Sequence, residues 1–344
     1  MNDIFYKEYD EILKQLNIKP LKNKSILITG ASGLIGSYIV YFLGYINTKY
    51  STNIRIYALS RHHEELVKKF NNVYGIEIIE HDLNNVFNID INFDYIIHAA
   101  SNAHPLAYSK DPVGTMKTNL LGTINLLEAA TKMKAKFLFV STGEIYGNNI
   151  DHAFTENDLG IIDTKIARSC YPESKRAAET LCIAYNAQYG TNVNIARLCY
   201  VYGSTITENN TRADAQFLRN AVNAQNIIMK SSGKQQRTYC YVADVVCALL
   251  TILLYGKDAE FYNVSSQNSI ASVHEYAQTL ANIANVKVIY DNPDEVEAKG
   301  YSKQADSILD STKLQQLGWK PNYSLLEGLE HTYKIKKSVL EKIN

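Results

Sequence analysis

The feature that most constrains this chain is a glycine-rich turn that directly follows an apolar run near the amino terminus. Residues 25–36 read Ser-Ile-Leu-Ile-Thr-Gly-Ala-Ser-Gly-Leu-Ile-Gly. In a strand–turn–helix unit, Gly30 permits the tight turn, Gly33 lets backbone amides approach a pyrophosphate, and Gly36 lets the helix pack close to the strand. The helix amino terminus then offers its positive dipole end to the phosphates. The turn therefore predicts a dinucleotide-binding loop.

After this turn, short apolar runs alternate with helical stretches. The expected strands cover 25–29, 54–59, 76–80, 95–99, 137–141 and 193–198, and the expected helices cover 34–45, 62–70, 114–133 and 171–188. Because buried parallel strands are short and apolar, this order predicts an α/β fold with a Rossmann-type, doubly wound parallel sheet. After about residue 202 the alternation loosens, with shorter elements at 217–224, 227–230, 243–254, 272–283 and 325–343.

The chain is expected to divide into three parts. An amino-terminal helical extension covers 1–23, a Rossmann dinucleotide-binding domain covers 24–202, and a smaller α/β substrate-binding lobe occupies most of 203–344. A segment near 243–258 is expected to return to the Rossmann domain. The extension carries a weakly amphipathic helix at 3–16, which we expect to pack on the body of the protein or on a second subunit.

Composition excludes several function classes. Lys+Arg and Asp+Glu both number 35, so the formal net charge is zero, which argues against a nucleic-acid or membrane-surface binder. The five cysteines are scattered without a CxxC pair, which indicates free thiols in a reducing cytoplasm and no zinc site. The chain opens without a signal-peptide pattern, and no apolar run reaches the ~20 residues that span a bilayer. We therefore expect a cytoplasmic protein without a bound metal.

The residues after the second and third strands bear on the cofactor. The second strand ends at Ser60 and Arg61, where no carboxylate is available for the ribose 2′-hydroxyl of NAD and an arginine suits the 2′-phosphate of NADP. This favours NADP over NAD, unless Arg61 is only a solvated helix residue. Asp82 could accept a hydrogen bond from the adenine amine, with Leu83 against the ring, or could equally cap a helix. Further expected cofactor contacts are Ser32, Leu34, Ile35, Ala99, Ala100 and Ser101, the last also a substrate contact.

Two motifs supply candidate catalytic side chains. Tyr171 and Lys175 are four residues apart, a spacing that places both on one face of a helix. A free tyrosine has a pKa of ~10, so it is a poor base at neutral pH. A neighbouring lysine and the positive nicotinamide ring favour the phenolate. Thr142 brings a hydroxyl to the carboxyl edge of the sheet, where such folds bind ligands.

The motifs stand in a fixed order along the chain: GASGLIG, HDL, HAAS, STGEIYG, YPESK, RTYCYVAD and LGW. In that order they resemble the extended short-chain dehydrogenase/reductases, and more narrowly the enzymes that epimerise, dehydrate or decarboxylate nucleotide-linked sugars. The resemblance covers about residues 24–335. It implies a homodimer that pairs through the helices near 114–133 and 171–188, and a role in making precursors of surface polysaccharides.

The resemblance implies how the catalytic residues act. Tyr171 would take the proton from the sugar C4 hydroxyl while hydride passes to the nicotinamide, Thr142 would hydrogen-bond the same oxygen, and Lys175 would hold the nicotinamide ribose. The 4-ketone is a branch point, because C5 becomes acidic, a C5 carboxylate can leave as carbon dioxide, or the ketone can be re-reduced from its other face. Glu144 could be the base at C5, but Gly143 stands where 4,6-dehydratases carry Asp or Ser, which removes the usual acid for water loss.

The substrate contacts follow from the same resemblance. Asn119 would line the pocket wall beside the cofactor, Arg237 would bind the diphosphate, and Arg212 would contact the nucleotide. The stretch 168–182 resembles the decarboxylases most, so Arg168 would face an acidic sugar or, alternatively, solvent.

Decarboxylation, dehydration and epimerisation of a 4-keto nucleotide sugar therefore remain open. Two rivals differ in class. An NADPH-dependent 4-keto-sugar reductase is favoured mildly by Arg61 and would release its cofactor during turnover. A non-catalytic NADP-sensing module of the same fold is disfavoured by the intact Thr142, Tyr171 and Lys175.

Overall fold

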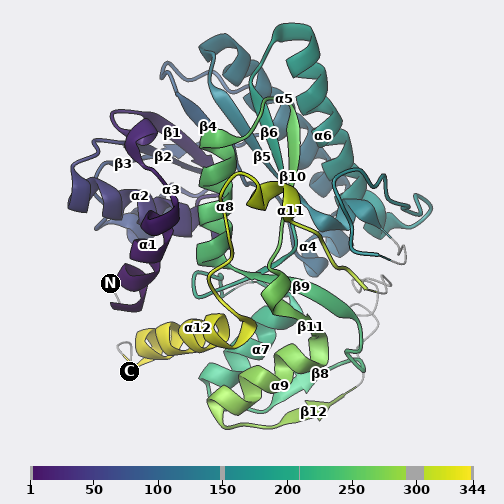
Figure 1. Cartoon of the computed structure of the whole chain (residues 1–344). Coiled ribbons are helices and arrows are strands. Elements are labelled where there is room, and N and C mark those ends of the chain that lie inside the picture. Colours follow the sequence, from purple (N-terminus) through teal and green to yellow (C-terminus); the bar gives the residue numbers. More distant parts are fainter. Residues whose placement is uncertain (1–2, 148–151, 209, 292–305, 342–344) are drawn as a thin grey trace.

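The structure, a computed structural model, describes residues 3–147, 152–208, 210–291 and 306–341 (Figure 1). The helices are α1 (Asp3–Gln15), α2 (Leu34–Tyr50), α3 (His63–Phe70), α4 (Pro105–Lys110), α5 (Pro112–Met133), α6 (Cys170–Tyr189), α7 (Ala213–Val222), α8 (Val242–Tyr255), α9 (Val273–Ala284), α11 (Thr312–Gln315) and α12 (Leu325–Leu340). The strands are β1 (Ser25–Thr29), β2 (Arg55–Ser60), β3 (Ile76–Glu80), β4 (Tyr95–His98), β5 (Lys136–Thr142), β6 (Val193–Leu198), β7 (Tyr200–Tyr202), β8 (Ile227–Met229), β9 (Gln236–Tyr241), β10 (Glu260–Val264), β11 (Ile270–Ser272) and β12 (Val288–Tyr290).

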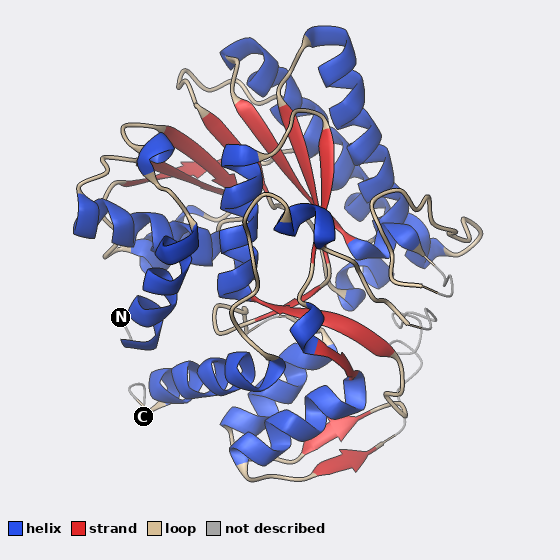
Figure 2. Cartoon of the chain, viewed as in Figure 1, coloured by secondary structure: helices blue, strands red, loops and turns tan. Residues whose placement is uncertain are grey.

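A seven-stranded sheet forms the larger part of the molecule (Figure 2). Its strand order is β10-β6-β5-β4-β1-β2-β3, and every neighbouring pair is parallel. The order reverses between β1 and β4, and doubly wound sheets bind ligands outside the carboxyl ends of their strands at such a point. The expected Rossmann-type fold is confirmed. Strand β10 is not among the predicted strands, because a glutamate and an asparagine interrupt its apolar run.

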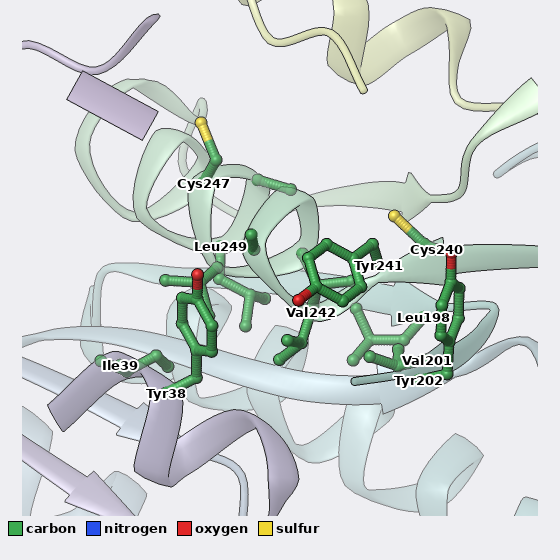
Figure 3. Packing of buried hydrophobic residues seen from close by; sticks show 14 of the residues in the cluster. Tyr38, Ile39, Leu198, Val201, Tyr202, Cys240, Tyr241, Val242, Cys247 and Leu249 are labelled. Atoms are coloured by element: carbon green, nitrogen blue, oxygen red, sulfur yellow. The ribbon is translucent and has the colours of Figure 1, made fainter. Parts of the chain in front are cut away.

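Helices cover both faces of this sheet. α5 and α6 pack against each other on one face, whereas α2 packs with α8 on the other (Figure 1). α8 is buried along nearly its whole length, over residues 242–253. Figure 3 shows the packing around it, with Tyr38 and Ile39 of α2 and Leu249 of α8 in one buried cluster. Within the described ranges, no helix is long and apolar enough to cross a membrane.

The smaller part of the molecule holds two short sheets. β7 and β9 are parallel and β11 runs antiparallel to β9, while β8 and β12 form a parallel pair. α7, α9 and α12 pack against one another beside these strands (Figure 1). The chain crosses between the two parts, because α8 and β10 lie with the large sheet although they follow β9. The domain boundaries stay a prediction, and the expected end of the last helix at 343 lies outside the described residues.

One buried carboxylate ties α1 to both parts of the molecule. Glu8 is 0% exposed and accepts hydrogen bonds from the hydroxyls of Tyr38 on α2, at 2.7 Å, and Tyr241 at the end of β9, at 2.6 Å. The Nδ1 atom of His331 on α12 lies 2.8 Å from Glu8 Oε1, the oxygen that also accepts from Tyr241. A buried carboxylate is stable only when such partners replace its hydration. α1 therefore holds a helix of the large part and a helix of the small part together.

Candidate active site

A cleft of about 820 Å³ lies between the two parts of the molecule. Residues at the carboxyl ends of β1, β4, β5 and β6 line one wall, and residues of α7, β9 and α9 line the other. Most residues that the sequence singles out for ligand binding line this cleft: Gly30, Ser32, Gly33, Leu34, Ile35, Gly36, Ala99, Ser101, Thr142, Glu144, Arg168, Tyr171, Lys175, Arg212 and Arg237. The fold thus brings motifs that are far apart in the sequence to one cavity.

The glycine turn between β1 and α2 leaves no room for side chains. Gly30 has a φ of +68°, and a Cβ there would lie 2.8 Å from backbone atoms of Ala99 and Ala100. A Cβ on Gly36 would lie 2.3 Å from the carbonyl oxygen of Gly30. Gly33 directly precedes α2 and lines the cleft, so the free amides of the first helical turn are available there to a phosphate. This backbone cradle fits the pyrophosphate of a dinucleotide.

Several expected cofactor contacts are not among the residues that line the cleft: Ser60, Arg61, Asp82, Leu83 and Ala100. Arg61 is exposed just beyond the end of β2. Asp82 accepts hydrogen bonds from the backbone and side-chain nitrogens of Asn84, at 3.0 and 2.9 Å, so it stabilises a local turn. Leu83 is buried in the apolar cluster beneath α5 and α6. The contacts to the adenosine end of the cofactor stay predictions.

Asn119 of α5 supports the wall of the cleft from behind, which corrects the expectation that it lines the pocket. Its side chain is 1% exposed, accepts a hydrogen bond from Ser101 Oγ at 2.8 Å and donates one to Ser174 Oγ at 2.8 Å. Ser101 lines the cleft, and Ser174 lies on α6 between Tyr171 and Lys175. α5 turns Asn119 inward, so this residue links the loop after β4 to the catalytic helix.

The catalytic candidates of β5 and α6 meet in the cleft. Tyr171 is 7% exposed; burial and the charge of Glu144 raise the pKa of its hydroxyl, and a hydrogen bond with Thr142 lowers it. Lys175 Nζ donates to the backbone oxygen of Val140 at 2.9 Å, and burial lowers the pKa of this lysine to about 8. Because burial dominates at Tyr171, the expected shift toward the phenolate needs a further positive charge nearby, such as a nicotinamide ring.

An ion pair and a second tyrosine lie beside Tyr171. Arg168 Nη1 donates to Glu144 Oε2 at 2.9 Å, with side-chain exposures of 17% and 18%, so Arg168 lies in the cleft and not in open solvent. The ring of Tyr108 on α4 stacks on Tyr171 with centroids 5.4 Å apart, and its hydroxyl accepts from Arg168 Nη2 at 3.4 Å. The Arg168 Nε is buried without a hydrogen-bond partner among the described residues. Tyr108 is not predicted from the sequence, because a tyrosine in a helix of 6 residues belongs to no recognisable motif.

Two further arginines approach the cleft from the smaller part. Arg212 is held by Asp214 through hydrogen bonds of 3.0 and 2.5 Å, and it donates to the backbone oxygen of Val201 at 2.6 Å. Arg237 of β9 stacks over the ring of Tyr200 with its guanidinium carbon 4.2 Å from the centroid, and it forms no ion pair with any described residue. Stacking leaves the donors at the edge of a guanidinium available, and that planar fork matches a phosphate.

Known proteins resemble this chain over most of its length. The model of the NAD dependent epimerase/dehydratase family matches residues 26–265. UDP-glucuronic acid decarboxylase 3 of Arabidopsis thaliana is 33% identical over 311 residues, which cover 89% of this chain and 87% of that protein. UDP-glucuronic acid decarboxylase 1 of Danio rerio is 30% identical over 318 residues, which cover 90% of this chain and 72% of that protein. Among solved structures, UDP-glucose 4-epimerase of Thermotoga maritima superposes with a TM-score of 0.77 at 25% identity, covering 92% of this chain and 99% of that one.

Proposed function

This chain belongs to the NAD dependent epimerase/dehydratase family, and on that premise we propose that it decarboxylates a nucleotide-linked hexuronate through a 4-keto intermediate. The chain is an enzyme of the nucleotide-sugar epimerase, dehydratase and decarboxylase type. The sequence leaves three reactions of the 4-ketone open. The relatives named UDP-glucuronic acid decarboxylase, at 33% and 30% identity, support decarboxylation among them.

The observation that carries this proposal is the pair of Arg168 and Glu144 beside Tyr171. An acidic sugar needs a cation in the cleft, and Arg168 offers one whose Nε is buried without a partner among the described residues. The sugar carboxylate would compete with Glu144 for this guanidinium, because two like charges beside each other are unfavourable. A neutral hexose would leave the ion pair between Arg168 and Glu144 intact. Arg168, once released from Glu144, is therefore the group that would accept the carboxylate of a hexuronate.

The reaction follows from the proposed positions of these side chains. A bound nicotinamide dinucleotide would accept hydride from C4 and later return it. Tyr171 takes the proton of the C4 hydroxyl while Thr142 holds the same oxygen, which yields a β-keto acid. The C5–C6 bond then breaks, carbon dioxide leaves, and the electron pair passes into the C4 carbonyl. A proton from solvent, passed on by the Glu144 carboxyl, is added to C5, and Tyr171 returns its proton to the C4 oxygen when hydride returns.

We propose NADP as the cofactor, with NAD as the alternative that the family description names. Arg61 is exposed directly after β2, and Ser60 stands there instead of a carboxylate. The same arginine suits the rival function, an NADPH-dependent 4-keto-sugar reductase. The two functions differ in their demand for cofactor: the decarboxylase returns its hydride to the sugar, whereas the reductase consumes one NADPH in each turnover.

We also propose a cytoplasmic homodimer that pairs through α5 and α6. Val113, Met116 and Leu121 leave apolar side chains on α5 that are 63%, 37% and 41% exposed. A second copy could cover such a surface in a symmetric interface. The five cysteines are free thiols, which a reducing cytoplasm maintains. Light scattering that gives the mass of one chain at working concentration would contradict the dimer.

Mass spectrometry in heavy water tests the function directly. The pure protein is incubated with UDP-, dTDP-, GDP- and CDP-linked hexuronates and hexoses, with and without added NADP or NADPH. We expect loss of carbon dioxide from a hexuronate with one deuterium gained at C5. Water loss from a hexose would indicate a dehydratase, an isomer of unchanged mass a C4 epimerase, and turnover only with added NADPH a reductase. Each of these three results, without carbon dioxide loss from any hexuronate, would overturn the proposal.

A further inference from the structure

The three arginines that line the cleft are held in two different ways. Arg168 and Arg212 each form an ion pair with a carboxylate of the cleft, at 2.9 and 2.5 Å. The side chain of Arg237 forms neither an ion pair nor a hydrogen bond with any described residue, and its guanidinium carbon lies 4.2 Å from the centre of the Tyr200 ring. Arg237 is thus a cation of the cleft whose charge no described carboxylate neutralises.

The pairing of β7 with β9 places the Tyr200 ring against this guanidinium. The two strands are parallel, and Tyr200 lies opposite Tyr239. Arg237 precedes Tyr239 by two residues on β9, so both side chains leave the same face of the strand. Tyr200 meets Arg237 from the neighbouring strand on that face. The stack is therefore built into the register of the small sheet.

Further rings keep the Tyr200 ring in place. Its centroid lies 6.0 Å from that of Tyr239, whose ring lies 4.8 Å from that of Tyr276 on α9. Tyr200 is half-buried among these rings and lines the cleft, so it has little freedom to turn away. An aromatic face attracts a guanidinium through its quadrupole but carries no net charge. Tyr200 can therefore orient Arg237 without neutralising it, whereas a carboxylate would cancel the charge that an anionic ligand needs.

We propose that Tyr200 is a positioning residue that holds Arg237 for the β-phosphate of the substrate, the phosphate that bears the sugar. A guanidinium binds two phosphate oxygens only when its plane is aimed at them, and stacking leaves the donors at its edge available. Because the ring fixes this plane before the ligand arrives, less side-chain entropy is lost on binding. The inference rests on the nucleotide-linked substrate of the proposed function and adds a residue that acts through Arg237.

Equilibrium binding of UDP and of UMP to the full chain isolates the second phosphate without any sugar. Isothermal titration calorimetry compares the natural protein with Tyr200→Met, which fills the space without an aromatic face, and Tyr200→Phe, which keeps the face. We expect Tyr200→Met to weaken UDP binding by about five- to tenfold and UMP binding by less than about twofold. Tyr200→Phe should keep both affinities within about twofold. The control Tyr50→Met removes a ring that lies 5.6 Å from Lys49 Nζ outside the cleft, and it should change neither affinity.

A double-mutant cycle tests whether Tyr200 acts through Arg237. Arg237→Gln alone should weaken UDP binding by about thirtyfold, because its charge-assisted hydrogen bonds to the phosphate are lost. Adding Tyr200→Met to Arg237→Gln should then change UDP affinity by less than about twofold, since the ring no longer has a cation to orient. Full additivity of the two losses would overturn the proposal, and so would equal losses of UDP and UMP binding in Tyr200→Met.

Fluorination of the ring covers the case in which Tyr200→Met does not fold. Tyr200→Phe with one, two or three fluorine atoms on its ring keeps the ring shape and weakens the negative face step by step. UDP affinity should fall with each added fluorine, and a constant affinity would contradict the stack. Equal affinity of the natural protein for UDP and UMP would overturn the role of Arg237 itself. A natural protein that binds UDP as expected but releases no carbon dioxide from a hexuronate would contradict only the proposed reaction, so the two proposals are tested separately.

Discussion

Two regions that line the cleft, the cofactor wall around Gly30–Gly36 and the substrate wall around Glu144, Arg168 and Tyr171, are built in different ways. The cofactor wall is made of backbone: a Cβ at Gly30 or Gly36 would lie within 2.8 Å of other backbone atoms. The substrate wall is made of charged side chains, such as Arg168 and Glu144, which pair at 2.9 Å. Substitutions in a backbone cradle can weaken cofactor binding but can hardly change which cofactor group it binds. A pair of side chains, in contrast, can be replaced by another pair with a different specificity. The reaction and the substrate are therefore decided on the second wall.

The largest loss of activity is expected from Tyr171→Phe on the substrate wall. The ring keeps its stacking on Tyr108, but no oxygen remains to take the C4 proton, so turnover of the hexuronate should fall by about 10³-fold. Binding of the cofactor, measured by calorimetry, should change by less than about twofold, because the lost interaction forms only in the transition state. Tyr189→Phe, at the exposed end of the same helix, is the control. Near-normal turnover by Tyr171→Phe would remove this residue from the mechanism.

Glu144→Gln, on the same wall, separates the catalytic role of this residue from its role in substrate binding. An amide cannot give a proton to C5, so kcat for the hexuronate should fall by about 10²-fold. KM should fall as well, because Arg168 loses its carboxylate partner and becomes available to the sugar. Steady-state kinetics separate the two effects, and Glu173→Gln on the surface of α6 serves as control. A raised KM with unchanged kcat would mean that Glu144 contributes to binding of the hexuronate and takes no part in proton transfer.

Two alanines on the cofactor wall should act differently from each other. Gly36→Ala would place a Cβ 2.3 Å from a carbonyl oxygen, so it should lower the free energy of unfolding by about 1–3 kcal/mol. Gly33→Ala would meet the carbonyl oxygen of Gly30 at 3.3 Å, so it should cost less stability than Gly36→Ala while cofactor affinity drops by about tenfold. Chemical denaturation and calorimetry measure the two quantities. The same loss of stability in both variants would argue against a cradle that admits the pyrophosphate at Gly33.

The smallest effect is expected where the large and small parts of the molecule meet at the rim of the cleft. His104 Nδ1 lies 3.0 Å from Thr211 Oγ1, and burial together with the charge of Arg212 lowers the pKa of His104 below 6.5. A depressed pKa means that the unfolded chain binds the proton more readily, so this contribution to stability is present above pH 6.5 and is lost as pH falls through the folded-state pKa. His104→Ala should raise KM by about two- to threefold. It should also weaken the pH dependence of the free energy of unfolding below pH 6.5. Thermal unfolding of both proteins at several pH values measures how stability changes with pH. The same slope of stability against pH in His104→Ala and in the natural protein would contradict the prediction.

The comparison also explains which parts of the site the sequence predicts. The cofactor wall depends on local backbone geometry, so the spacing of its glycines in residues 30–36 indicates it directly. Tyr108 and Tyr200 reach the cleft only through tertiary packing, and neither stands in a motif that assigns it a role. Asp214 offered a usable signal, because it stands two residues after Arg212 and pairs with it. The sequence places Asn119 beside the cleft, but its side chain is buried behind the lining residues and does not line the pocket.

The burial of Glu8 has a consequence for how the molecule is made. Its hydroxyl partner Tyr241 lies 233 residues later in the chain, and His331 lies 323 residues later. A ribosome releases α1 before β9 and α12, yet the burial of this carboxylate is compensated only once these distant partners have emerged. α1 can therefore complete this contact only after β9 and α12 have been made, although it precedes both in the chain. The burial of Glu8 thus requires a chain that has been synthesised at least as far as His331.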